Sequence, residues 1–202
     1  MLFVFRHGES LTNIDMDKTC AYPLTDDNIV LTAKGVQHAL DVAKELKTTG
    51  ILPEKIITSP LSRARQTSYI LASTLQHGCP IIEKPEFHEI RWHKEDGSFN
   101  RLEEYGVDID EVYDDINLRP LPDLESQQDV YNRVTPHLPE IIEEAMDKPI
   151  YVVCHYFVIR AIRAYIEHGS PNAMLNYNPP NVDPTVYTPD VLEKALRYEK
   201  AS

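Results

Sequence analysis

The sequence lacks an excess of positive charge. Lysine and arginine together number 20 against 32 aspartates and glutamates, and the formal net charge of the 202 residues is −12. A protein that binds a nucleic-acid backbone needs basic residues in excess to neutralise the phosphates, so we expect no nucleic-acid partner. A small anionic ligand remains compatible with this charge, because a few arginines can form a local positive pocket on an acidic protein.

Cysteine is scarce, and long apolar runs are absent. Cys20, Cys79 and Cys154 are far apart and form no C-x-x-C pair, which argues against a disulfide framework or a zinc knuckle and favours a reducing compartment. No run of about 18 apolar residues occurs, so we expect no membrane span. The apolar stretch at residues 2–5 is too short for a signal peptide. We therefore expect a cytoplasmic protein.

The sequence does contain short apolar runs that alternate with longer periodic segments. The runs predict strands at residues 2–5, 55–58, 81–83, 87–90 and 150–154. The periodic segments predict helices at residues 32–46, 61–75, 108–116, 127–146, 158–167 and 191–198, with a break in the fourth at Pro136 and Pro139. This alternation indicates an α/β fold, a three-layer sandwich in which helices flank a mainly parallel sheet.

Two stretches interrupt this pattern. Residues 93–126 are acidic with little periodicity, and we interpret them as a variable cap insertion. Residues 169–202 are interpreted as an irregular C-terminal segment, because five prolines lie between Pro171 and Pro189. The length of 202 residues fits one domain spanning residues 1–202.

Chemically informative residues follow three of the predicted strands. Arg6 and His7 come after the first strand, Ser59 and then Arg63 after the strand at 55–58, and His155 after the strand at 150–154. Ligands of parallel sheets bind at the carboxyl ends of the strands. If these strands are adjacent, two histidines and two arginines converge in one crevice, and guanidinium groups match the geometry of phosphate oxygens.

This set of residues suits phosphoryl transfer. A histidine offers a nitrogen lone pair near neutral pH, and neighbouring arginines favour its neutral form. Arg6, Arg63 and His155 would stabilise the charge of the transferring group without a metal. The leaving alkoxide then requires a proton from a nearby carboxylic acid. His88 and His93 show no recognised ligand spacing, so we expect no metal site.

Four motifs, in this order, resemble those of the histidine phosphatase superfamily, which includes the cofactor-dependent phosphoglycerate mutases. They are Arg6-His7-Gly8-Glu9, Leu31-Thr32 with Gly35, Ser59-Pro60 with Arg63-Ala64 and Thr67, and a second histidine, His155, after a late apolar strand. The likeness covers roughly residues 1–168. It implies an α/β sandwich and a phosphohistidine intermediate.

The resemblance also implies roles for individual residues. It assigns the nucleophile to His7, phosphate clamps to Arg6 and Arg63, and the second histidine of the pocket to His155. Glu89 stands at the position of the family's general acid, and Glu86 is the less favoured alternative.

Two further residues are expected to bind substrate. Asn13 occupies the place of an asparagine that contacts phosphate in the family, with a simple turn role as the alternative. Tyr156 stands where the family usually has glycine, and we expect its ring to line the pocket.

The leading hypothesis is a metal-independent phosphatase of the histidine acid phosphatase type, a phosphoric monoester hydrolase that takes a small phosphorylated substrate and needs no cofactor. The family's mutases carry a long insertion between the acid and the second histidine, whereas only 66 positions separate Glu89 from His155 here. A cofactor-dependent phosphoglycerate mutase remains an alternative. Tyr156 motivates another, a catalytically silent module that binds a phosphorylated ligand.

Overall fold

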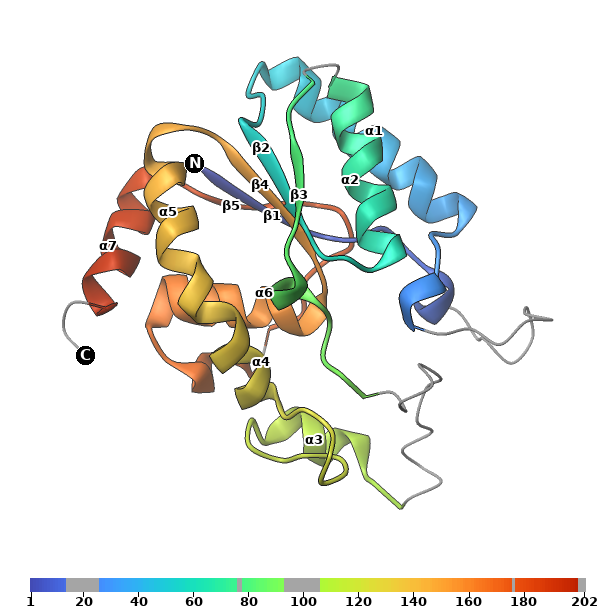
Figure 1. The fold of residues 1–202 in the computed structure, drawn as a ribbon, viewed down its shortest axis with the longest axis vertical. Helices are drawn as coiled ribbons and strands as arrows, with labels where there is room; N and C mark the ends of the chain where they lie inside the picture. The colour runs from blue at the N-terminus through green and yellow to red at the C-terminus, as the bar shows by residue number, and fades with distance from the viewer. Residues whose placement is uncertain (14–25, 76–77, 93–105, 176, 200–202) are drawn as a thin grey trace.

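A five-stranded sheet forms the centre of the computed structural model, which describes residues 1–13, 26–75, 78–92, 106–175 and 177–199 (Figure 1). The strands are β1 (Leu2–Arg6), β2 (Lys55–Thr58), β3 (Ile81–Glu83), β4 (Ile150–Cys154) and β5 (Thr185–Tyr187). Their order across the sheet is β3-β2-β4-β1-β5. The first four strands run parallel, and β5 pairs with β1 in the antiparallel direction.

Strands β1 and β4 carry continuous apolar runs, at residues 2–5 and 150–154, because both faces of the sheet are covered. Leu2 and Val4 of β1 belong to one hydrophobic cluster, and Phe3 and Phe5 belong to the other. All five residues of β4 are buried. A strand buried on both faces carries a continuous apolar run rather than alternating polarity, which explains the sequence of both strands.

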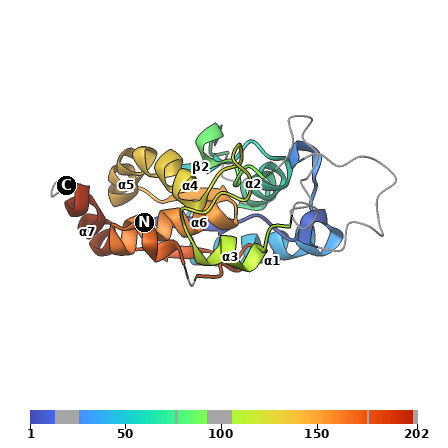
Figure 2. The same ribbon diagram turned by 90° about the horizontal axis from the view of Figure 1, so that it is seen from below.

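Helices form the two outer layers. Helices α1 (Ala33–Thr49) and α2 (Ser62–Leu75) cover one face, and α4 (Gln127–Val134), α5 (Leu138–Asp147) and α6 (Tyr156–Arg163) cover the other (Figure 1). Helix α7 (Pro189–Glu199) packs against α5, far from α1 in both views (Figure 2). The predicted three-layer α/β sandwich is confirmed.

Several local predictions are confirmed, and one strand is wrong. The proline-rich break lies where expected, since the 3-10 turn Thr135–His137 separates α4 from α5. The predicted strand at 87–90 does not form: a 3-10 turn, Pro85–Phe87, is followed by chain without regular structure. Pro85 begins this turn, and the carbonyls of the segment bond to a side chain of α4 in place of a neighbouring strand.

The C-terminal segment also needs a correction. Residues 169–202 were expected to be irregular before a short terminal helix, yet Thr185–Tyr187 forms β5 and pairs with β1 from Leu2 to Val4. A three-residue strand is too short to show alternation in the sequence, and only its partner reveals it. The terminal helix is present as α7.

Part of the expected cap insertion lies outside the described residues, which resume at Gly106. Its described part contains helix α3 (Ile109–Asp114), close to the predicted helix at 108–116. The boundaries of the cap and the single-domain assignment stay predictions. No helix in the described ranges has the length and apolar character needed to cross a membrane.

Candidate active site

The carboxyl ends of three neighbouring strands bring the predicted residues together. Arg6 ends β1 directly opposite Cys154 at the end of the parallel strand β4. His7 and His155 are the next residues, and the backbone N–H of His7 donates to the carbonyl of Cys154 at 3.0 Å. Strand β2 lies on the other side of β4, and Ser59 follows it. The sheet register therefore sets both histidines side by side.

The two imidazoles lie in contact with each other. The ring centroids of His7 and His155 are 5.0 Å apart, with an angle of 56° between the planes. Both side chains are buried. His155 Nε2 is 2.7 Å from Ser59 Oγ, whereas its Nδ1 is buried and has no hydrogen-bond partner among the described residues. This second nitrogen is available to a ligand.

A hydrogen bond to the backbone orients the ring of His7. Its Nδ1 lies 2.7 Å from the carbonyl oxygen of Gly8, so Nδ1 carries the proton and the lone pair resides on Nε2. Thr67 on α2 holds the same loop, because its hydroxyl accepts the backbone N–H of Gly8 at 3.1 Å and donates to the carbonyl of Arg63 at 2.9 Å. The loop that carries His7 is thus tied to the helix that carries Arg63.

The environment keeps both histidines neutral. Burial lowers the pKa of His7 well below its usual range, Arg63 and Arg6 lower it further, and the bond to Gly8 opposes them. Burial also lowers the pKa of His155 well below its usual range, with further contributions from Arg63 and His7. A neutral imidazole keeps a free lone pair at neutral pH, so it can act as a nucleophile.

The two predicted arginines lie near enough for their charges to lower the pKa of both imidazoles. Arg63 is buried in the first turn of α2, where the helix dipole favours an anion. Arg6 is half-buried, and its Nη1 donates to the carbonyl of Pro179 at 3.4 Å. Arg65, two positions further along α2, instead forms an exposed ion pair with Glu83 at 3.1 Å.

Glu89 lies at the N-terminus of α6. Its Oε2 accepts the backbone N–H of Tyr156 at 2.9 Å, and its Oε1 accepts those of Ile90 at 2.9 Å and Phe157 at 3.2 Å. Because α6 begins directly after His155, the bond to Tyr156 places the carboxyl group at the residue that follows this histidine. The N–H of Tyr156 is therefore engaged by Glu89 in this structure.

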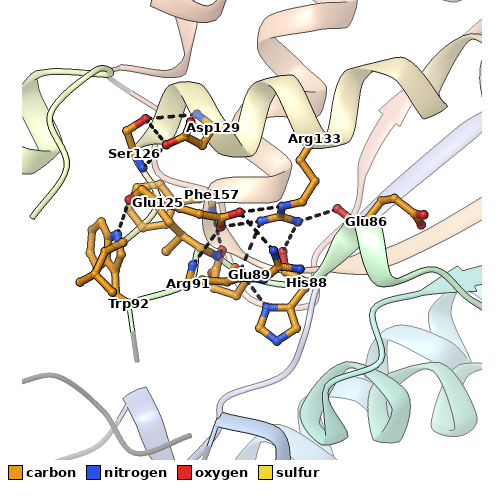
Figure 3. Close-up of polar contacts among 12 residues, drawn as sticks. Glu86, His88, Glu89, Arg91, Trp92, Glu125, Ser126, Asp129, Arg133 and Phe157 are labelled. Carbon is orange, nitrogen blue, oxygen red and sulfur yellow. Dashed lines mark hydrogen bonds and ion pairs between the residues drawn. The ribbon is translucent and has the colours of Figure 1, made fainter. Parts of the chain in front are cut away.

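Burial raises the pKa of Glu89, although the N–H donors of Ile90 and Phe157 and the charges of Arg63 and Arg6 act against the rise. A raised pKa is the property that a proton donor requires. Glu86, the alternative acid, directs its side chain away from Glu89 (Figure 3). Its contact with this region is through its backbone carbonyl.

The ring of Tyr156 lies between charged and aromatic groups. The guanidinium carbons of Arg6 and Arg160 are 5.1 and 5.3 Å from its centroid, distances typical of cation–π contacts. Tyr113 of α3 packs against it edge-on at 6.2 Å. The side chain that replaces the family's usual glycine is thus in contact with one of the two predicted phosphate-binding arginines.

Asn13 has a turn contact in this structure. Its Oδ1 accepts hydrogen bonds from the backbone N–H of Ser10 at 3.0 Å and from the hydroxyl of Ser10 at 3.2 Å, and the side chain is exposed. This is the alternative role considered for it. A contact with substrate phosphate stays a prediction.

No group of three or more His, Cys, Asp or Glu side chains in the described part of the chain is arranged to hold a metal ion. His88 lies beside Glu89, but its Nδ1 is 2.8 Å from the backbone carbonyl of Glu89. His93 lies outside the described residues.

A comparison with family models decides the affiliation of this fold and site. The model of the histidine phosphatase superfamily (branch 1) matches residues 2–197. The chain belongs to the histidine phosphatase superfamily. The resemblance inferred from four short motifs over roughly residues 1–168 is therefore confirmed, and the match continues beyond it to residue 197.

Relatives of this superfamily member include both mutases and phosphatases. It is 26% identical to the 2,3-bisphosphoglycerate-dependent phosphoglycerate mutase of Staphylococcus saprophyticus over 216 positions, which cover 92% of each chain. It is also 26% identical over 168 positions to the uncharacterized phosphatase PhoE of Bacillus subtilis, with 82% of this chain and 77% of that one covered.

Solved structures of the superfamily share the fold. A mycobacterial glucosyl-3-phosphoglycerate phosphatase in complex with VO3 matches with a TM-score of 0.71 and 20% identity, over 91% of this chain and 88% of that one. An Entamoeba histolytica phosphoserine phosphatase in complex with 3-phosphoglyceric acid matches with a TM-score of 0.65 and 22% identity, over the same shares of the two chains. At these identities the likeness establishes the architecture alone.

Sequence reasoning overlooked several residues of this region. Ser59 was noted only as part of a motif, yet its hydroxyl contacts His155. Tyr113 lies in a predicted helix of the acidic insertion. An aromatic residue among acidic ones was the feature that could have indicated a buried contact there. Arg160 follows Tyr156 by one helical turn, a spacing that predicts contact between the two side chains.

Proposed function

We propose that this superfamily member is a phosphomonoester hydrolase that forms a phosphohistidine intermediate on His7. One observation supports the proposal most: two buried, neutral imidazoles, of His7 and His155, lie 5.0 Å apart beside Arg6 and Arg63. This arrangement offers one nucleophilic nitrogen and several preorganised donors to a single tetrahedral anion.

In the first step, the Nε2 lone pair of His7 attacks phosphorus. The P–N bond forms as the bond from phosphorus to the ester oxygen breaks, and the leaving alkoxide takes the proton of Glu89. Arg6, Arg63 and His155 bind the phosphoryl oxygens and stabilise their charge during transfer.

In the second step, water takes the place of the departed alcohol. The Glu89 carboxylate accepts a proton from this water as its oxygen attacks phosphorus, and the P–N bond breaks. Inorganic phosphate leaves, His7 is again neutral, and Glu89 is again protonated. Asn13 and Tyr156 contact the substrate in this proposal.

Alignment lengths favour hydrolysis over isomerisation. The 92% of this chain matched to the S. saprophyticus mutase is about 186 of 202 residues, yet the alignment runs over 216 positions, so the mutase has residues without a counterpart here. The 82% matched to the B. subtilis phosphatase is about 166 residues in 168 positions, with almost no such excess. A mutase must retain its product and exclude water, which usually requires additional covering structure.

The remaining features of the proposal are a small phosphorylated substrate, no nucleic-acid partner and a reducing, cytoplasmic compartment. The net charge of −12 supports the expectation that no nucleic acid is bound. Cys79 and Cys154 are free thiols, which is consistent with a reducing compartment.

The test is a phosphoester panel of phosphoserine, 3-phosphoglycerate, glycerol phosphate and 4-nitrophenyl phosphate, measured on wild type and His7→Ala. We expect phosphate release by wild type, loss of release in His7→Ala, and acid-labile phosphate on the quenched wild-type chain. Vanadate should inhibit, and EDTA should not. Strong inactivation by EDTA would refute the metal-independent mechanism.

The similarity to mutases supports a second candidate, a cofactor-dependent phosphoglycerate mutase. Isomer formation from 3-phosphoglycerate that depends on added bisphosphoglycerate, without net phosphate release, would establish it in place of the hydrolase. Tight phosphate binding without turnover on any ester would instead indicate a silent binding module.

A further inference from the structure

The segment that carries Glu89 has little structure of its own. After the 3-10 turn at Pro85–Phe87, no helix or strand is formed as far as residue 92, where this described range ends. A general acid must nevertheless be held within a fraction of an ångström of its working position. Besides the bonds of the Glu89 carboxylate to the start of α6, the backbone of this segment is held by Arg133 of α4 and by Glu125, which lies just before that helix (Figure 3).

Arg133 of α4 holds the backbone on one side of Glu89. Its Nη1 donates to the carbonyls of Glu86 at 2.7 Å and His88 at 3.0 Å, and its Nη2 donates to the carbonyl of Glu89 at 3.5 Å. Three carbonyls of an irregular segment thus converge on one guanidinium group. Backbone bonds of this kind normally come from a neighbouring strand.

Glu125 completes the arrangement. Its carboxylate receives Nε of Arg133 at 2.9 Å and Nη2 at 2.8 Å, a bidentate pair. The same carboxylate accepts the backbone N–H of Arg91 at 3.0 Å, and the carbonyl of Glu125 accepts the indole N–H of Trp92 at 2.8 Å. The Arg133–Glu125 pair therefore forms hydrogen bonds to the chain both before and after Glu89.

The pair itself is firmly placed. The side chains of Arg133 and Glu125 are only 14% and 15% exposed. Ser126, next to Glu125, is the N-cap of α4 and forms a capping box with Asp129, which fixes where the helix begins. All five N–H groups of the guanidinium have an acceptor, an arrangement that a lysine with its three donors cannot reproduce.

We propose that the Arg133–Glu125 pair is a positioning device for catalysis, which sets the place of the Glu89 carboxyl group at the N-terminus of α6. This inference rests on the proposed role of Glu89 as proton donor. Neither Arg133 nor Glu125 touches the phosphoryl group in this mechanism. Both act through the backbone of the segment that carries the acid.

The test uses the leaving group, because a misplaced proton donor harms only the esters that need a proton. An alkyl phosphate leaves as a strongly basic alkoxide, whereas 4-nitrophenyl phosphate leaves as a stable phenolate. We expect Arg133→Met to lower kcat/KM about 100-fold for the best alkyl substrate of the panel and less than about threefold for 4-nitrophenyl phosphate. Glu89→Gln should show the same selectivity.

Arg133→Lys keeps the charge but loses the fork, so it should give an intermediate, equally selective defect. Its alkaline activity limit should also move to lower pH, because a loosened Glu89 is less buried and its pKa falls.

Arg119→Met is the matched control. Arg119 bonds to Leu124 and Asp129 at 3.0 and 2.7 Å in the same region, and no hydrogen bond joins it to the described residues 85–92, so selectivity should be unchanged.

Two failures are distinguishable. If Glu89→Gln slows both ester classes equally, the proposed proton donor is wrong. Suppose instead that Glu89→Gln slows only the alkyl esters. If the folded variants Arg133→Met and Arg133→Lys then slow both ester classes equally, or slow neither class, the positioning role is overturned. Thermal unfolding and the dissociation constant for vanadate establish that each variant is folded with an intact phosphate site. Should Arg133→Met not fold, Arg133→Lys and Glu125→Gln decide the question by the same ratio.

Discussion

Gly35 and Glu9 lie backbone against backbone. A β carbon placed on Gly35 would be 2.0 Å from the carbonyl oxygen of Glu9 and 2.8 Å from its nitrogen. The same Glu9 carbonyl accepts the backbone N–H of Thr32, the N-cap of α1, at 2.9 Å. The start of α1 therefore packs directly against the loop that carries His7. Only glycine at position 35 allows the two backbones to come this close.

Replacement of Gly35 by alanine should displace this loop. The neighbouring atoms belong to the backbone and cannot rotate away, so we expect Gly35→Ala to lower the free energy of unfolding by about 1–3 kcal/mol. Because His7 moves with the loop, kcat should fall roughly tenfold or more. Urea unfolding and steady-state kinetics measure the two effects.

Gly50, at the other end of α1, provides the control. Its φ is 71°, and no described residue beyond its own neighbours in the chain comes within 4 Å of a β carbon placed there. Gly50→Ala should therefore cost about 1 kcal/mol through backbone strain alone. Its kcat should equal that of wild type. An equal loss of kcat in both variants would contradict the link between Gly35 and His7.

The pH dependence of hydrolysis should reflect His7 and Glu89. His7 must be neutral to attack phosphorus. Because its pKa is lowered, it stays neutral down to a pH well below the usual pKa of histidine. Glu89 must be protonated, and its raised pKa extends the active range upward before activity falls as the proton is lost. For an alkyl phosphate we expect a bell-shaped plot of kcat/KM against pH.

Glu89→Gln should remove the alkaline limb of that plot and lower kcat/KM about 100-fold, whereas Glu86→Gln should leave the plot unchanged. A limb that persists in Glu89→Gln and disappears in Glu86→Gln would transfer the role of proton donor to Glu86.

The buried histidines should also make stability pH-dependent. The folded protein holds His7 and His155 neutral, while the unfolded chain protonates them near pH 6.5. Below that pH the unfolded state binds more protons, so stability falls as pH falls. Each histidine contributes a slope of at most about 1.4 kcal/mol per pH unit.

Urea unfolding at about pH 7.5 and about pH 5.5 measures this change. His155→Gln should lose less stability between the two values than wild type does, and His137→Gln, outside the site, should lose as much. Equal losses in all three proteins would show that His155 takes up its proton in the folded state as readily as in the unfolded chain.

Tyr156 should contribute to substrate binding through Arg6. Its ring lies 5.1 Å from the guanidinium carbon of Arg6 and 5.3 Å from that of Arg160. Tyr156→Phe keeps the stacked ring and should leave KM within about twofold of wild type, whereas Tyr156→Ala should raise KM about fivefold. A lower KM in Tyr156→Ala would mean that the ring restricts the pocket rather than supports the arginine.

The strand ends were predictable because the relevant signal is local. An apolar run followed at once by Arg6-His7 or by His155 reports a buried strand and the residue at its carboxyl end within a few positions. Parallel pairing then leaves little freedom in where these residues meet, as the contact between the two imidazoles shows.

The surroundings of Glu89 were not predictable in the same way. The apolar residues at 87–90 suggested a strand, but the segment is held by a side chain 44 positions away, at Arg133. Nor does the sequence around Tyr156 reveal that two guanidinium groups stack near its ring. Such contacts depend on how helices from distant parts of the chain pack.

The sequence by itself determined the family, the alternation of strands and helices, and the histidines and arginines at the strand ends, because hydrophobic periodicity and short motifs are properties of neighbouring residues. Only the tertiary structure decided the tautomer of His7, the raised pKa of Glu89, the edge strand β5 and the support of Glu89. Burial and hydrogen bonding between remote segments exist only once the chain has folded, and these set the protonation and the geometry of the site.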